Sequence, residues 1–173
     1  ARQGKLLDAT KAMDELQVKL KSTPEIVRAS IGPEVITVQV RQPNDPKNVD
    51  MYFYGRRKPK TPAEIARSKT GTADPLPFEW GEARPVKMKT RDIAELPSVL
   101  FSPSQVAWSR IPALAKEALK ILEEIEQPKV EIASVSKVAD SQAIFISIPV
   151  DGVRGSGTLR ADNQGSIILA ERR

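Results

Sequence analysis

Neither cysteine nor histidine occurs among the 173 residues of this chain. The lack of cysteine excludes disulfides and thiol chemistry, and the lack of histidine excludes Ser-His-Asp triads and imidazole pH switches. Together the two absences exclude zinc sites built on Cys or His and haem ligation through His. We therefore expect no catalytic residue, no metal site and no cofactor, and we keep an enzyme based on carboxylates or lysine only as an alternative.

Long apolar runs are also missing, because no stretch approaches the roughly 18 to 20 residues that a membrane-spanning helix needs. The chain begins Ala-Arg-Gln-Gly without an initiator methionine, so we expect that an upstream leader or anchor was removed. A chain without cysteine fits an oxidising compartment. We therefore expect an extracytoplasmic location, periplasmic or membrane-anchored, with the removed N-terminal anchor as the membrane contact.

The residues that are present suit a compact chain. Apolar residues make up 40% of the sequence and charged residues 28%, which excludes disorder throughout. A chain of this size buries roughly two-thirds of its unfolded surface, so its core is large enough to hold the fold without disulfides or metals.

The first part of the chain has the pattern of one helix followed by strands. Residues 5–21 carry apolar side chains at steps of three and four, which predicts an amphipathic helix that ends before Pro24. Residues 26–31 and 35–41 then read as strands, and a third strand starts at Val49. The apolar positions of the helix are Leu6, Ala9, Met13, Leu16 and Leu20.

The same order occurs again in the second part of the chain. Apolar residues at helical spacing predict a helix over 111–126, entered through Pro112 and closed before Pro128. Strands are expected from Val130, around 144–148, and on both sides of the turn Asp162-Asn163-Gln164-Gly165. The repeat is one of pattern, because the two parts share almost no identical residues.

These patterns predict an α+β protein made of two α-β-β-β(-β) units, each a helix packed on a small antiparallel sheet, joined by a long Pro-rich segment. The first unit spans 1–90 and contains a basic, Pro-rich insertion at about 56–84. A linker at 91–108 leads to the second unit at 109–173. The middle of the chain is expected to be mostly loop, with Pro85–Lys89 returning as a fourth strand of the first sheet.

The closing hairpin of the second unit carries a resemblance to a known family. Its sequence is Leu159-Arg160-Ala161-Asp162-Asn163-Gln164-Gly165-Ser166-Ile167, a strand, an Asp-x-x-Gly turn and a strand. With the α-β-β-β order, this resembles tandem PepSY-like modules, and the paired arrangement resembles the beta-lactamase inhibitory protein architecture. The resemblance implies a non-enzymatic binding or inhibitory module outside the cytoplasm.

Positive charge is concentrated in the middle of the chain. Residues 55–91 hold ten basic and four acidic side chains, whereas the whole chain has a net charge of +5. Such a segment attracts acidic proteins, phosphates or anionic lipids, and tryptophan is enriched where proteins bind one another. The candidate partner-binding residues are therefore Arg56, Arg57, Lys58, Lys60, Trp80, Arg84 and Lys87.

The expected partner is another protein with an acidic surface, in a bacterial envelope complex. Nucleic acid is disfavoured as a partner because aromatic residues are not interleaved with the cations. The first alternative function is nevertheless a binder of anionic ligands, either nucleic acid or anionic lipid. A homo-oligomer is a further possible assembly. Because exposed charges contribute little to stability, reversing Arg56, Arg57 and Lys58 should leave the fold intact. Pairing of this cluster with Glu123, Glu124 and Glu126 is the competing, structural interpretation.

Overall fold

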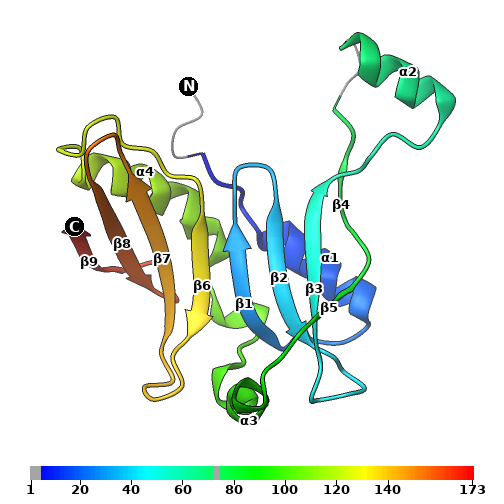
Figure 1. The fold of residues 1–173 in the computed structure, drawn as a ribbon, viewed down its shortest axis with the longest axis horizontal. Helices are drawn as coiled ribbons and strands as arrows, with labels where there is room; N and C mark the ends of the chain where they lie inside the picture. The colour runs from blue at the N-terminus through cyan, green and yellow to red at the C-terminus, as the bar shows by residue number, and fades with distance from the viewer. Residues whose placement is uncertain (1–4, 72–74) are drawn as a thin grey trace.

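A single antiparallel sheet forms the body of the protein in the computed structural model, which describes residues 5–71 and 75–173 (Figure 1). The described strands follow the order β4-β3-β2-β1-β6-β7-β8-β9, and β5 pairs with β3 beside β4. The prediction of a mixed α+β protein is confirmed. In chain order the elements are α1 (Thr10–Leu20), β1 (Ile26–Ile31), β2 (Ile36–Arg41), β3 (Val49–Arg56), α2 (Pro62–Thr70), β4 (Phe78–Trp80), β5 (Arg84–Val86), α3 (Thr90–Val99), two 3-10 turns (Pro103–Gln105 and Trp108–Arg110), α4 (Ile111–Ile121), β6 (Ala133–Lys137), β7 (Ile144–Asp151), β8 (Ser156–Asp162) and β9 (Ile167–Arg172).

The pairing of β1 with β6 joins the two halves of the chain at the centre of the sheet. In this ladder Ala29 lies opposite Val135 and Ile31 lies opposite Ala133, and all four side chains are fully buried. Instead of one small sheet for each unit, the halves share one continuous sheet. The division of the chain at 90 and 109 into two repeated units stays a prediction.

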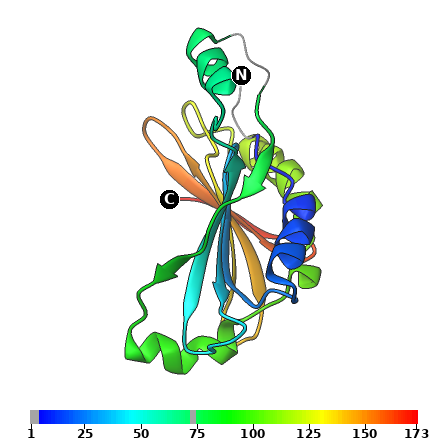
Figure 2. The ribbon, with the colours of Figure 1, turned by 90° about the vertical axis from the view of Figure 1, so that its right-hand side faces the viewer.

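Both long amphipathic helices, α1 and α4, cover the same face of this sheet (Figure 2). The strands alternate accordingly, so that in β2 the side chains of Ile36, Val38 and Val40 are buried while those between them are half-buried. One apolar core therefore lies between the helices and the sheet. The helices contribute Ala12, Met13, Leu16, Ile111, Leu114, Ala115 and Ala118 to it.

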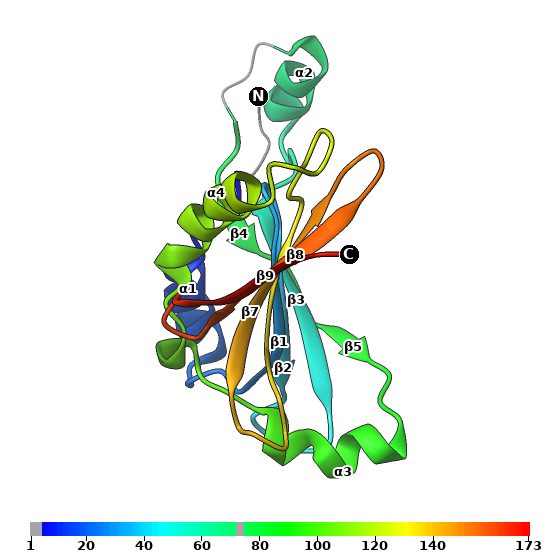
Figure 3. The ribbon, with the colours of Figure 1, turned by 90° about the vertical axis from the view of Figure 1, so that its left-hand side faces the viewer.

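The opposite face of the sheet is polar at its centre. Thr37, Ser30, Ser134 and Ser147 lie in register across β2, β1, β6 and β7. Small hydroxyl side chains suit a face that neither α1 nor α4 covers, because they can hydrogen-bond to water. Helix α3 lies at one end of the sheet and extends toward this second face (Figures 2 and 3).

Both predicted helices are shorter than the apolar spacing indicated. Helix α1 begins at Thr10 rather than residue 5, because the Asp8 carboxylate accepts hydrogen bonds from the backbone N–H and the hydroxyl of Thr10, at 2.9 and 2.6 Å. Leu7 instead donates its N–H to the carbonyl of Gly32. The buried residues Leu6 and Ala9 therefore reach the core from positions before the first residue of the helix.

Helix α4 ends at Ile121, five residues before the predicted end. The acidic residues Glu123, Glu124 and Glu126 follow it in a turn. Within this turn the Glu126 carbonyl accepts the N–H of Val153, and its carboxylate lies 3.9 Å from Arg154. The structure thus places Glu126 beside the turn between β7 and β8, which overturns its predicted pairing with the basic cluster.

The middle of the chain contains two helices, so the prediction of mostly loop was wrong. Helices α2 and α3 account for much of it, and both β4 and β5 pair with the outer edge of β3. The expected fourth strand is confirmed in part, because Val86 of β5 lies opposite Val49. Residues 72–74 of the expected insertion lie outside the described residues.

A substitution at Gly157 of β8 tests how closely β9 and the turn after α4 pack around this position. A Cβ atom at this position would lie 2.7 Å from the carbonyl oxygen of Glu171 and 3.0 Å from Cδ1 of Leu122. Gly157→Ala should therefore lower the free energy of unfolding by about 1 to 3 kcal/mol in urea denaturation.

Gly81→Ala is the matched control, because its Cβ would come no closer than 3.7 Å to the Phe53 carbonyl oxygen. We expect this variant to unfold within about 0.5 kcal/mol of the parent protein. Equal stability of the two variants would contradict the close packing at Gly157.

Candidate functional site

The densest positive charge lies on a projection that we call the basic arm, residues 56–71. It contains six basic residues (Arg56, Arg57, Lys58, Lys60, Arg67 and Lys69) and one acidic residue (Glu64). The arm continues from the end of β3 into α2, which stands beyond the end of the sheet (Figures 1 and 3). None of the residues of α2 is buried, so packing against the core does not hold this helix.

Local signals at both ends specify α2. The hydroxyl oxygen of Thr61 accepts the backbone N–H of Glu64 at 3.1 Å, and Pro62 occupies the first turn. Gly71 ends the helix with a φ of 68°, a conformation that favours glycine. The pattern Thr-Pro-Ala-Glu with a glycine after the helix is a sequence-level signature of capping, and attention to it would have predicted α2.

A bidentate ion pair connects the helix to the strand end. The two terminal nitrogens of the Arg57 guanidinium donate to the two oxygens of Glu64, each at 3.0 Å. The Lys60 N–H donates to the same carboxylate at 3.0 Å. The hydrogen bonds from Arg57 and then from Lys60 lower the pKa of Glu64 from its ordinary 4.5 to about 2, so this carboxylate stays ionised at neutral pH.

The base of the arm is held by contacts of Arg56. Its Nη1 donates to the carbonyl of Leu76 at 3.0 Å, and its guanidinium lies 4.6 Å above the ring of Phe78. That ring stacks on Tyr54 with centroids 5.5 Å apart. Arg57 adds a backbone hydrogen bond to the carbonyl of Pro77 at 2.9 Å, so the outgoing and returning segments of the arm are fastened together.

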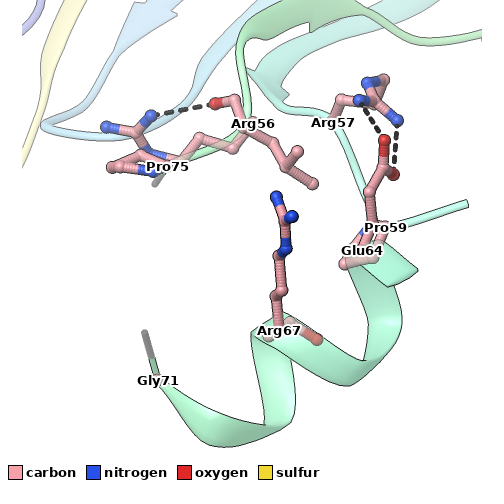
Figure 4. A pocket seen from close by; sticks show the side chains of 9 residues that line it. Arg56, Arg57, Pro59, Glu64, Arg67, Gly71 and Pro75 are labelled. Carbon is pink, nitrogen blue, oxygen red and sulfur yellow. Dashed lines mark hydrogen bonds and ion pairs between the residues drawn. The ribbon is translucent and has the colours of Figure 1, made fainter. Parts of the chain in front are cut away.

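A cavity of about 460 Å³ lies between α2 and the returning segment (Figure 4). The Arg57–Glu64 pair forms one wall, and Arg67 extends from α2 into the opening. The side chain of Arg56 extends to one side of Arg67, beside Pro75. The described residues that line it are Arg56, Arg57, Pro59, Glu64, Arg67, Ser68, Gly71, Pro75 and Leu76.

The structure brings only some of the predicted site residues together. Four of them, Arg56, Arg57, Lys58 and Lys60, lie on the basic arm. Arg84 is in β5, opposite Met51, whereas β4 pairs with β3 at Arg56. Met51 and Arg56 are five residue steps apart along β3, which corresponds to about 17 Å. Arg84 lies 5.0 Å above the ring of Phe53, and exposed Lys87 follows β5.

Trp80 is part of the core, which corrects its prediction as a partner-binding residue. Its side chain is 8% exposed, and its indole N–H donates to the carbonyl of Ala12 in α1 at 2.7 Å. Its ring packs on Tyr54 with centroids 5.1 Å apart. The physical reason is strand pairing, because β4 on the edge of β3 turns this residue under α1.

The expectation that charge reversal of Arg56, Arg57 and Lys58 leaves the fold intact also needs correction. Arg57 holds Glu64 and Arg56 holds Leu76, so reversing these two residues removes the fastenings of the arm. Lys58 is exposed and makes no hydrogen bond or ion pair with the residues that the structure describes. Lys60 lies 4.0 Å from Glu79 with its side chain 70% exposed, a weak pair in water. Among the predicted cations of the arm, Lys58 is therefore the one to reverse without structural cost.

Nothing in the described parts of the chain gathers three or more His, Cys, Asp or Glu side chains as a metal site. The searched residues likewise include no helix that is both long enough and apolar enough to cross a membrane.

Comparison with known proteins found no matching protein-family model and no matching curated protein. Among solved structures, the chain is similar to a protein from Clostridium difficile 630 described as a "putative lipoprotein". The TM-score is 0.47 and the sequence identity 19%, over 95% of this chain and 91% of the other. A likeness at that level does not establish a shared fold, and the resemblance to PepSY-like modules stays a prediction.

The Arg57–Glu64 pair gives a pH-dependent prediction. Because the pKa of Glu64 is lowered to about 2 in the folded chain, its ionised form stabilises the arm above pH 4.5, and this contribution is lost as the pH falls toward 2. Arg57→Gln should raise the titration midpoint of Glu64 from about 2 toward 4.5 in carbon-detected NMR, because the backbone hydrogen bond from Lys60 remains. Arg67→Gln removes an equal charge without touching the pair and should leave the midpoint near 2; a parent midpoint near 4.5 would contradict the pairing.

The core position of Trp80 gives a second prediction. Trp80→Phe keeps a ring against Tyr54 but removes the buried indole N–H that donates to the Ala12 carbonyl. We expect the free energy of unfolding to fall by about 1 to 3 kcal/mol, measured by thermal or urea denaturation. An unchanged stability would restore Trp80 as a candidate for partner binding.

Proposed function

We propose that this protein is a non-enzymatic binding module of the bacterial envelope, outside the cytoplasm, and that its basic arm binds an acidic surface of a partner protein. The observation that carries the proposal is the combination of order and exposure in α2. The helix is capped at both ends and fastened by Arg57, yet it buries no side chain of its own. A helix that serves only the core would bury an apolar face.

The charge of the arm supports an acidic partner. Of its seven charged residues, one cation and the one carboxylate neutralise each other through the Arg57–Glu64 pair. The remaining five cations are not balanced within the arm, and such a surface speeds association with a surface of opposite charge.

The aromatic residues favour a protein over a nucleic acid. Residues 56–71 contain no aromatic side chain. Of the neighbouring rings, Phe78 is stacked between Arg56 and Tyr54, and Trp80 is buried. Single-stranded nucleic acids need aromatic faces on which their bases can stack, and the arm does not offer one.

The chemistry of the cavity favours binding over catalysis. Among the described residues that line the cavity, Glu64 is the one carboxylate, and a pKa of about 2 makes it a poor general acid or base at neutral pH. The extracytoplasmic part of the proposal is supported by the lack of cysteine, which suits an oxidising compartment.

The test reverses charge on the arm without disturbing its fastenings. Lys58 and Lys69 are both exposed and do not contact Glu64. The double variant Lys58→Glu/Lys69→Glu should bind immobilised poly-L-glutamate with an association rate lowered on the order of tenfold at low salt, because steering by the arm is lost. The difference from the parent should shrink at physiological salt.

The matched control is Lys19→Glu/Lys120→Glu, which changes the net charge equally on α1 and α4. We expect a smaller effect on the rate. Equal effects of the two double variants would show that total charge alone matters and would contradict the role of the arm. Binding of a single-stranded DNA oligonucleotide without binding of polyglutamate would instead support the nucleic-acid alternative.

A further inference from the structure

We propose that the cavity of the basic arm is a receptor for a short segment of the partner polypeptide that presents a carboxylate beside an apolar side chain. Arg67 and Arg56 bind the carboxylate, and Pro59, Pro75 and Leu76 contact the apolar group. This inference rests on the proposed function and names the feature of the acidic partner that is recognised.

Among the described residues that line the cavity, positive charge exceeds negative charge. Glu64 is occupied by Arg57 and by the Lys60 N–H. In the part of the chain that the structure describes, no hydrogen bond or ion pair engages the guanidinium of Arg67, which extends into the opening (Figure 4). A guanidinium carries five N–H donors in a planar fork that matches a carboxylate, so this group favours an anion.

Arg56 supplies a second donor group from a fixed position. One of its nitrogens donates to Leu76, and its plane rests over Phe78. Most of its N–H donors remain for a ligand. Because the backbone contact and the ring hold this side chain before binding, little conformational entropy is lost when the ligand arrives.

The size and the apolar wall of the cavity argue for more than a bare anion. A volume of about 460 Å³ is in the range of sites that enclose small organic ligands or a few residues of a peptide. Leu76 and Pro59 are half-buried at its wall, and an inorganic ion would leave their exposed surface in water. An apolar side chain next to the carboxylate would cover that surface.

The experiment uses the full chain and a fluorescein-labelled peptide, Leu-Glu-Leu-Glu-Leu-Glu-Leu, with binding followed by fluorescence anisotropy at physiological salt. Arg67→Met should weaken binding roughly tenfold or more, because a charge-assisted hydrogen bond is lost. Lys69→Met removes an equal charge from the same helix, outside the cavity lining. It should change the affinity about twofold or less.

A second pair of variants tests the cavity without changing charge. Ser68→Phe places a ring in the cavity, whereas Ala66→Phe places one at an exposed position of α2 outside the lining. We expect loss of peptide binding in the first variant and retention in the second. The Glu64 titration midpoint, unchanged near 2 in both, would show that the arm remains folded.

Three results would overturn the inference. Equal weakening by Arg67→Met and Lys69→Met would mean that the arm attracts acids by total charge alone, which leaves the proposed function standing. Equal binding of the Leu-Gln-Leu-Gln-Leu-Gln-Leu peptide would remove the carboxylate from recognition. Displacement of the peptide by low millimolar inorganic phosphate would indicate a site for a bare anion. If neither the Glu peptide nor polyglutamate binds the parent protein, the proposed function falls as well.

Discussion

The antiparallel pairing of β1 with β6 sets the arrangement of the whole molecule. It turns two sets of strands into one sheet, and α1 and α4 then cover a single face of it. The middle of the chain must therefore pass from the outer edge of β3 around the sheet to the helix layer. On this path it pairs with β3 twice, and Phe101 exchanges two backbone hydrogen bonds with Ile26 at the start of β1. The middle segment is therefore more than a connection between the halves, because it pairs with the outer edge of β3 and with the start of β1.

The basic arm depends on a different kind of stability. A nine-residue helix without buried side chains is marginal by itself in water, so its order rests on the caps at Thr61 and Gly71 and on the Arg57–Glu64 pair. These contacts are local, and their loss need not disturb the core. Segments that bind partners are commonly drawn from such regions of low local stability. The local contacts thus hold the proposed site in a fixed conformation that presents its cations. Because the site does not pack on the core, changes in the arm leave the rest of the fold unaffected.

The seven residues predicted as one interaction surface separate into three environments. Four lie on the arm, Arg84 and Lys87 lie near the other end of β3, and Trp80 lies in the core. Charge and composition identified the segment correctly as unusual. They could not assign its residues to the three environments, because that assignment depends on which residues of β3 pair with β4 and which pair with β5. Arg67, which the candidate residues omitted, reaches the cavity only because α2 folds back toward Leu76.

Local patterns in the sequence determined the mixed helix and strand content, the strands β1 and β2 almost to the residue, the start of β3, the approximate positions of β7 and β8, and the concentration of positive charge. Those features depend on side-chain periodicity and turn residues, which act over a few neighbouring positions. The caps of α2 were equally local and could have been read from Thr61 to Gly71. Only the tertiary structure decided that the halves share a sheet and that Trp80 is buried. Each of these depends on contacts between segments whose relative placement no local pattern fixes: Trp80 meets the Ala12 carbonyl 68 residues away in the chain, and β1 meets β6 across more than half of the sequence.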